Sequence, residues 1–266
     1  ACHGLGSSSI KLCFNNGYET CNMLFSGDLG NKSNPILKKS EIPYFTGIDA
    51  VFVETTYAGR IHGSQEENWK DIRQEIAKTI LRGGKVILPA FAVGRTQEML
   101  YILYKDIQTN SDDVAKVLKN TNIYVDSTLA VLATKVFRRF PSEFTPEIQE
   151  MIKAGNSPFG FARLHLIKDK QESVELCASK EPCIILSASG MCEAGRVIFH
   201  LRENLDNPNN TIILTGYQGE NMLGRRILDG QNVVNVAGKR CRVLAKVLYI
   251  DTLSAHADQL GIMKWL

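Results

Sequence analysis

Three short segments of the chain run from apolar residues into small and polar ones. Residues 183–187 lead into Ala188-Ser189-Gly190, residues 211–214 lead into Thr215-Gly216-Tyr217, and residues 249–253 lead into Ser254-Ala255-His256. Turns of this kind follow the strands of open α/β sheets, where backbone amides and hydroxyls are presented to ligands. The pattern therefore indicates a ligand-binding site at the ends of these strands, with a histidine beside the ligand.

Four side chains could act on such a ligand. His3 precedes a glycine-rich turn and could bind a metal, and Asp28 follows a strand and could bridge two cations or cap a turn. Glu54 ends an apolar strand, where a carboxylate needs a cation or hydrogen bonds, for which Arg60 is one candidate. His256 could donate a proton to a leaving alkoxide if a carboxylate holds its other nitrogen, or it could simply cap a helix. Glu54 and Asp258 are both candidates for that carboxylate.

A second group of residues is suited to bind phosphate. Hydroxyls and free amides at the turn after residue 186 suit an anionic oxygen, and a helix start after Gly94 adds a positive dipole end. Neither a G-x-G-x-x-G nor a G-x-x-x-x-G-K sequence is present, so a dinucleotide site or a P-loop has little support. The candidate phosphate- or RNA-binding residues are Arg95, Ser187, Ser189, Gly190, Arg196, Tyr217 and Arg225.

The order of elements defines the fold class. A hairpin is expected over residues 8–26, a strand over 49–53 and a helix from about Ser64, after which strands and helices alternate from 85 to 214. This alternation predicts a mostly parallel, doubly wound α/β sheet covered by helices on both faces. The hairpin-rich ends around the alternating middle suggest one domain inserted into another.

Composition narrows the class of protein only broadly. The chain has 266 residues, of which 44% are hydrophobic, and a net charge of +3 that is too small to indicate a nucleic-acid partner. No apolar run is long enough to cross a membrane and no signal peptide is evident, so a cytoplasmic location is expected. The seven dispersed cysteines include no C-x-x-C pair and are expected to be reduced.

Taken together, the motifs resemble the β-CASP branch of the metallo-β-lactamase superfamily over nearly the whole chain. Ala1-Cys2-His3 and Ser26-Gly27-Asp28 are similar to the third and fourth metallo-β-lactamase motifs. Glu54-Thr55-Thr56-Tyr57 resembles β-CASP motif A, and Ser254-Ala255-His256 resembles motif B. Further matches to the inserted domain are residues 89–95, 187–191 and 216–218.

The resemblance implies a zinc-dependent ribonuclease that hydrolyses RNA phosphodiester bonds with metal-activated water, using two zinc ions per site. His3 would be a zinc ligand, Asp28 a bridging ligand, and His256 the proton donor or transition-state stabiliser, oriented by Glu54. It also implies single-stranded RNA as partner, and a homodimer or a larger nuclease complex is possible. The expected domains are a partial metallo-β-lactamase αββα domain over residues 1–57, the β-CASP domain over 58–248, and a return to the first domain over 249–266.

The chain departs from the family pattern in its metal ligands. It contains neither the HxHxDH motif nor the C-terminal histidine of motif C, and Ala58 stands where the family usually has glycine. The chain is therefore expected to be a fragment of a longer protein, and to bind zinc poorly and be inactive by itself. The alternative hypothesis is a metal-free RNA-binding or scaffolding paralogue, and the sequence does not separate an endonuclease from a 5′-exonuclease. A small-molecule hydrolase is disfavoured by the long insertion.

Overall fold

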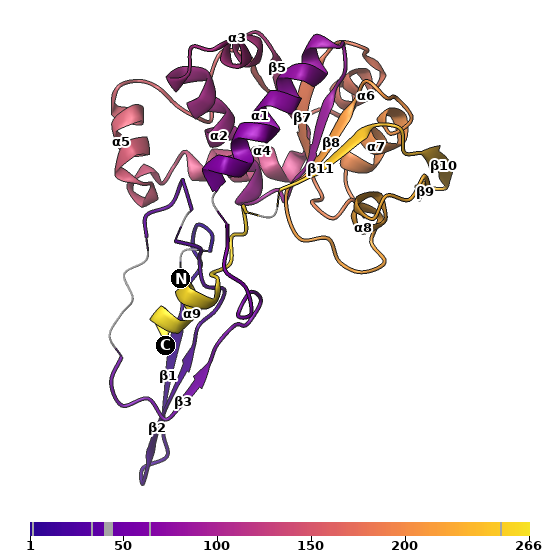
Figure 1. Cartoon of the computed structure of the whole chain (residues 1–266). Coiled ribbons are helices and arrows are strands. Elements are labelled where there is room, and N and C mark those ends of the chain that lie inside the picture. Colours follow the sequence, from indigo (N-terminus) through magenta and orange to yellow (C-terminus); the bar gives the residue numbers. More distant parts are fainter. Residues whose placement is uncertain (2, 33, 40–44, 64, 251) are drawn as a thin grey trace.

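The chain folds into a large α/β unit and a smaller, elongated β-rich unit (Figure 1). The computed structural model describes residues 1, 3–32, 34–39, 45–63, 65–250 and 252–266. The centre of the large unit is a six-stranded sheet in which every strand pair is parallel. Its strands lie in the order β11 (Lys246–Tyr249), β8 (Thr211–Leu214), β4 (Val86–Pro89), β7 (Cys183–Ser187), β5 (Asn122–Val125) and β6 (Leu164–Leu166).

Helices cover both faces of this sheet, because successive side chains of its strands point to opposite faces. On β4, Val86 and Leu88 pack in the larger hydrophobic core, whereas Ile87 packs in a second core on the other face. One face is covered by α1 (Gln65–Leu81), α2 (Arg95–Thr109), α3 (Asp113–Lys119), α4 (Thr128–Phe137) and α5 (Pro146–Lys153). The other is covered by α6 (Lys170–Ala178), α7 (Val197–Asn204), α8 (Leu223–Leu228) and the hairpin β9 (Val233–Val236) and β10 (Lys239–Arg242). The predicted α/β class with a parallel, doubly covered sheet is confirmed.

The smaller unit is built from both ends of the chain. Strands β1 (Ile10–Asn15) and β2 (Thr20–Phe25) form the expected antiparallel hairpin, and β3 (Ala50–Phe52) pairs parallel to β2. The last helix, α9 (Gln259–Trp265), lies beside these strands (Figure 1), and its Ile262 packs with Leu29 in a small separate core. This contact of the chain ends agrees with an inserted domain, while the boundaries at residues 58 and 248 stay a prediction.

Several sequence expectations need adjustment in detail. The helix expected from Ser64 corresponds to α1, although Ser64 itself lies outside the described residues. Helices α3 and α8 and the short 3₁₀ helix at Pro141–Glu143 were not predicted, because each is too short to show a clear apolar period. Among the described residues, the six cysteines are free thiols, as expected, and Cys2 lies outside them. None of the described helices has the length and apolar character that a membrane crossing would require.

Candidate metal centre and strand-end loops

Three side chains suited to bind a metal converge in the smaller unit. One donor atom from each of His3, Asp28 and His256 lies within 4.8 Å of the other two. Nε2 of His3 is 4.0 Å from Oδ2 of Asp28, and the His3 and His256 rings are 4.3 Å apart between centroids. Zinc bonds of 2.0–2.2 Å place neighbouring tetrahedral donors about 3.4 Å apart, so small side-chain rotations would complete this half of a site. The sequence predicted these residues to act together, and the structure brings them together.

Local backbone geometry positions Asp28 and His256. Asp28 follows Gly27, which has a φ of +59°. Gly27 also lies close to Ser8, because a Cβ added to Gly27 would be 2.4 Å from the Ser8 carbonyl oxygen. The segment that carries His256 pairs with the segment after Asp28 through an antiparallel bridge between Gly30 and His256. This bridge brings residues from the two ends of the chain to one point.

Glu54 holds His256. Nδ1 of His256 lies 3.1 and 3.0 Å from the two carboxylate oxygens of Glu54, and Oε1 of Glu54 also accepts a hydrogen bond from the Leu29 amide at 2.6 Å. Burial alone would raise the pKa of Glu54, but hydrogen bonds from Thr56, His256 and Leu29 outweigh it and leave the pKa below its usual value. The carboxylate is therefore ionised at neutral pH, and its contact with Nδ1 leaves Nε2 of His256 for a ligand.

Asp258, the other candidate partner of His256, and Arg60, the candidate partner of Glu54, make different contacts. Asp258 caps α9 by accepting a hydrogen bond from the Gly261 amide at 2.9 Å, so of the two carboxylates considered, Glu54 is the one that holds His256. The backbone carbonyl of Arg60 accepts from the Gln259 amide, and its guanidinium makes no ion pair with Glu54 among the described residues. The structure therefore places Glu54, and not Asp258, against His256, and Arg60 does not pair with Glu54 among the described residues.

The chemistry of the side chains gathered at this site is compatible with a zinc ion. Burial, and then the neighbouring His256, lower the pKa of His3, so its ring is neutral at neutral pH and has a lone pair to give. The imidazole of His3 and the carboxylate of Asp28 are both common kinds of zinc ligand. Two contacts beside the site were not predicted: Nε2 of His62 lies 3.1 Å from the His256 carbonyl oxygen, and the Tyr57 ring lies 5.0 Å from the His62 ring. No spacing in the sequence signals either contact.

Replacing His3 by alanine is expected to weaken Zn²⁺ binding by at least about tenfold, because one of the two predicted ligands, His3 and Asp28, is removed from a partly assembled site. The affinity is measured by competition with a chromophoric chelator. His165→Ala is the matched control, because His165 is an exposed histidine on β6 that contacts Asn122. Equal affinity in the His3 variant and the wild type would remove His3 from the site.

The carboxyl ends of the three central strands are tied together by side-chain and backbone hydrogen bonds. The Ala90 amide donates to the Ser187 carbonyl at 3.0 Å, and the Thr215 hydroxyl donates to the Pro89 carbonyl at 2.8 Å. Gln218 donates to the Gly190 carbonyl at 3.0 Å. The loops after β4, β7 and β8, which carry most of the predicted phosphate-binding residues, therefore form one connected surface.

Ser187 does not present its hydroxyl to this surface. The residue is buried, and its Oγ donates to the carbonyl of Asp126 at 2.7 Å. Ser189 is half-buried and accepts a weak hydrogen bond from the Ala194 amide at 3.3 Å, and Gly190 is buried. The expectation that both hydroxyls bind phosphate is therefore corrected for Ser187, because β7 is buried along its whole length and turns this side chain inward.

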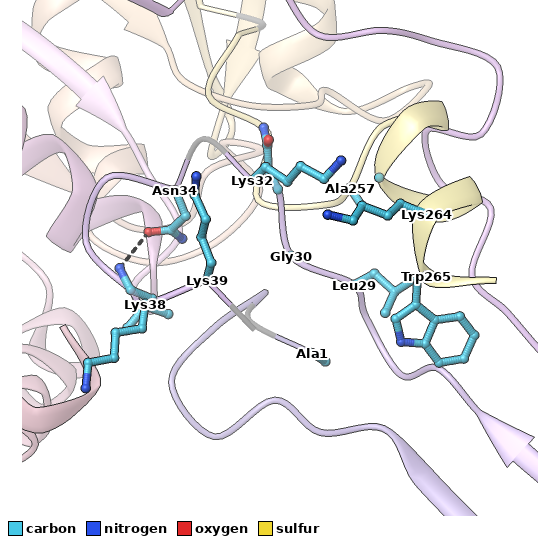
Figure 2. A pocket seen from close by; sticks show the side chains of 13 residues that line it. Ala1, Leu29, Gly30, Lys32, Asn34, Lys38, Lys39, Ala257, Lys264 and Trp265 are labelled. Carbon is cyan, nitrogen blue, oxygen red and sulfur yellow. Dashed lines mark hydrogen bonds between the residues drawn. The ribbon is translucent and has the colours of Figure 1, made fainter. Parts of the chain in front are cut away.

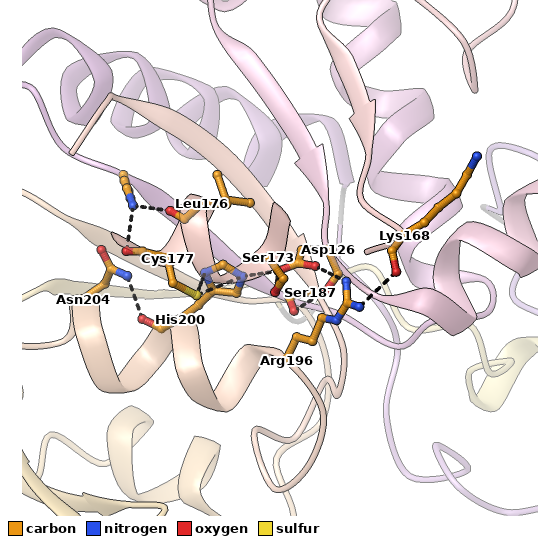
Figure 3. Close-up of polar contacts among 10 residues, drawn as sticks. Asp126, Lys168, Ser173, Leu176, Cys177, Ser187, Arg196, His200 and Asn204 are labelled. Carbon is orange, nitrogen blue, oxygen red and sulfur yellow. Dashed lines mark hydrogen bonds and ion pairs between the residues drawn. The ribbon is translucent and has the colours of Figure 1, made fainter. Parts of the chain in front are cut away.

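Arg196 belongs to a buried polar cluster around Asp126 (Figure 3). One carboxylate oxygen of Asp126 accepts from Arg196 at 2.7 Å, and the other accepts from Ser173 at 2.6 Å and contacts Nε2 of His200 at 2.7 Å. Arg196 also donates to the Lys168 carbonyl at 3.1 Å. Its guanidinium thus joins the start of α7 to the end of β5, which is a structural role rather than the predicted contact with RNA.

The same cluster includes a thiol in an arrangement that resembles a nucleophile with its base. Sγ of Cys177 is 3.3 Å from Nδ1 of His200, whose other nitrogen faces Asp126. Burial, and then the Asp126 charge, raise the pKa of Cys177 to about 11. A thiol with this pKa stays protonated at neutral pH, so the three residues are a packing network and not a catalytic triad.

The remaining predicted residues differ in their exposure. Arg95 is buried and pairs with Glu98 at 2.6 Å, so it is held within α2 and is not free for a ligand. Arg225 is exposed and pairs with Asp229 at 2.9 Å, an arrangement that a phosphate can displace in water. Tyr217 is 56% exposed on the loop after β8. Tyr217 and Arg225 therefore remain predicted RNA contacts, and Arg95 is corrected to a structural residue.

A small basic cavity of about 200 Å³ lies between the segment after β2 and α9 (Figure 2). Its lining includes four lysines, Lys32, Lys38, Lys39 and Lys264, together with the indole of Trp265. Lys32, Lys38 and Lys39 are close together in the sequence, whereas Lys264 is more than 200 residues away and is brought beside them only by the fold. Their positive charge favours polyanions near the candidate metal centre.

Comparison with known proteins agrees with this architecture. Residues 96–227 match the Beta-Casp domain. The chain is 32% identical over 244 residues to Ribonuclease TTHA0252 of Thermus thermophilus, covering 92% of this chain and 54% of that protein. It is 34% identical over 269 residues to an RNase J-like protein of Methanocaldococcus jannaschii, covering 99% of this chain and 58% of that protein.

A third relative, the transcription termination factor FttA of Pyrococcus abyssi, is 30% identical over 273 residues, covering 99% of this chain and 40% of that protein. The chain belongs to the β-CASP family of the metallo-β-lactamase superfamily, as its motifs suggested. It spans 40 to 58% of the length of these three relatives.

Proposed function

We propose that the chain supplies the RNA-binding domain and part of the catalytic centre of a zinc-dependent ribonuclease that hydrolyses single-stranded RNA. The main support is the convergence of His3, Asp28 and His256, with Glu54 holding His256. The names of two relatives, a ribonuclease and an RNase J-like protein, favour the same activity. A cytoplasmic location and assembly into a homodimer or larger nuclease complex are part of this proposal.

Each residue of the centre has a distinct role in this proposal. Zinc bound at such a site supplies a nucleophilic water at neutral pH and offsets the negative charge of the phosphate. His3 and Asp28 hold the metal, and Asp28 has an exposed carboxylate that can contact a second cation. His256, oriented by Glu54, donates a proton from Nε2 to the leaving oxygen. The ionised Glu54 contacts Nδ1 of His256 and thereby orients the ring for this donation.

The strand-end surface provides the contacts to RNA. Ser189, Gly190, Tyr217 and Arg225 lie on the connected loops after β7 and β8 or at the helix that follows. Because the 266 residues contain no HxHxDH sequence, we propose that these residues alone bind zinc weakly and cleave RNA poorly. The catalytic measurements below therefore use the whole protein.

The test compares cleavage of end-labelled single-stranded RNA by the zinc-loaded whole protein and by its Asp28→Asn variant. Loss of a ligand charge is expected to lower the rate constant of cleavage by at least about 100-fold and to lower zinc content. Asp113→Asn is the matched control, because Asp113 is an exposed aspartate that pairs with Lys116. Fragment lengths then distinguish internal cuts from removal of single nucleotides at the 5′ end.

The alternative function is a metal-free RNA-binding or scaffolding paralogue. A zinc-loaded wild type that binds RNA and leaves it intact would support this alternative. A wild type that neither binds nor cleaves RNA would overturn both.

A further inference from the structure

An exposed aromatic ring lies beside the candidate RNA surface without a role in the predicted site. Phe91 follows β4, and its side chain is 44% exposed. Its backbone is fixed, because its carbonyl oxygen accepts hydrogen bonds from the amide and the hydroxyl of Thr96 at 3.2 and 2.8 Å. A phenyl ring that is half in water on a fixed backbone is suited to contact an apolar surface of a ligand.

Gly190 determines where this ring lies. A Cβ added to Gly190 would be 3.1 and 3.2 Å from two ring carbons of Phe91 and 3.2 Å from its amide nitrogen. The backbone of Gly190 does not have a positive φ, so backbone conformation does not require glycine at this position. The missing side chain is instead needed because the Phe91 ring packs directly against the main chain of the loop after β7.

A second exposed ring is attached to the same loop. Tyr217 is 56% exposed, and the neighbouring Gln218 donates to the Gly190 carbonyl at 3.0 Å and to the Gly216 carbonyl at 2.8 Å. Gly190 is thus contacted by the loop after β4 through Phe91 and by the loop after β8 through Gln218. The two exposed rings belong to loops joined through Gly190, which follows Ser189 in the chain.

We propose that Phe91 is a stacking platform for a base of single-stranded RNA, positioned by Gly190 next to the backbone contacts of the same loop. This inference rests on the proposed RNA-binding function. It adds a contact between the protein and a base of the RNA, in addition to the contacts with phosphate. Single-stranded nucleic acids are bound in this way when aromatic rings flank a polar groove, because every base has an aromatic face. Phe91 positions the RNA and takes no part in the chemical step.

The test measures binding of fluorescent single-stranded oligoadenylate, and of an abasic ribose-phosphate oligomer of equal length, to the chain with metal removed by a chelator. Phe91→Leu is expected to weaken binding of oligoadenylate by about fivefold or more and to leave binding of the abasic oligomer unchanged. Phe91→Trp should retain the wild-type affinity for oligoadenylate. The salt dependence of binding should be the same in all three proteins, since no phosphate contact is altered.

Phe14→Leu is the matched control, because Phe14 is a similarly exposed phenylalanine on β1, which belongs to the smaller unit (Figure 1). Melting curves show whether each variant is folded. Equal affinity of Phe91→Leu and wild type for oligoadenylate, or an equal loss for the abasic oligomer, would overturn the stacking role while leaving the proposed RNA-binding function intact. A wild type that binds neither oligomer would overturn both proposals.

Discussion

Replacement of His256 by alanine is expected to reduce the rate constant of RNA cleavage by the whole protein by about 10² to 10⁴-fold, because the proton donor for the leaving oxygen is lost. The geometry supports this expectation, since both Glu54 oxygens contact Nδ1 of His256 at 3.1 and 3.0 Å and direct Nε2 outward. The rate is measured under single-turnover conditions, so that product release does not mask the chemical step. His165→Ala, which alters an exposed histidine on β6, is expected to leave the rate unchanged.

Two further measurements separate proton donation from metal binding. In the first, the leaving oxygen of the RNA is replaced by sulfur. The leaving group then departs as a thiolate and needs no proton, so the His256 variant should cleave this RNA at nearly the wild-type rate. Glu54→Gln should lower the rate by about 10 to 100-fold, because it removes the carboxylate that orients the His256 ring. If the His256 variant instead loses zinc and does not recover on the sulfur substrate, His256 is a metal ligand and the proton donor lies elsewhere.

Replacement of Asp126 by asparagine is expected to lower the free energy of unfolding by about 3 kcal/mol. The carboxylate is fully buried and has three partners, Arg196, Ser173 and His200, so loss of its charge leaves the guanidinium without its counterion. A loss of this size lowers the melting temperature by about 6 to 12 °C in a chain of this length. Asp113→Asn, which alters a fully solvated ion pair, is expected to cost less than about 0.5 kcal/mol.

The effect of Asp126 has a defined dependence on pH. Burial would raise its pKa, but hydrogen bonds from His200, Ser173 and Arg196 outweigh burial and hold the pKa below the usual value. A carboxyl group with a depressed pKa in the folded state stabilises the protein above its unfolded pKa of about 3.9, and this stabilisation is lost as pH falls through the folded pKa. Denaturant titrations should therefore show the difference between wild type and Asp126→Asn at neutral pH, and a smaller difference below about pH 4. If the difference in stability between wild type and Asp126→Asn were constant across this pH range, the charge of Asp126 would not be the source of that difference.

The order of strands and helices could be predicted from the sequence because it depends on local patterns. The strands β4, β7 and β8 are continuous apolar runs, as expected for a sheet covered on both faces, and the turns after β7 and β8 were predicted from the small and polar residues that follow them. Short elements such as α3 and α8 were not predicted, because six or seven residues do not define an apolar period.

The partners of individual side chains could not be predicted, because they depend on packing between distant segments. Whether Glu54 or Asp258 holds His256 is decided by the Gly30–His256 bridge, which no local pattern encodes. Ser187 and Arg95 have suitable chemistry for phosphate, yet the first is turned inward by a fully buried strand and the second pairs with a buried glutamate. Residue type and position identified the loops correctly, but not which side chains on them face the solvent.

The bridge between Gly30 and His256 also determines when the catalytic centre can form. Glu54 and His256 are separated by 202 residues along the chain, and the parallel sheet lies between them. During synthesis the ribosome releases Asp28 and Glu54 long before their histidine partner, so the site of a nascent chain is incomplete until residue 256 has been translated. A folded insertion shortens the effective span between these residues and lowers the entropic cost of closing it. The inserted domain thereby sets the order of assembly, because Glu54 and His256 can meet only after the residues between them have been translated.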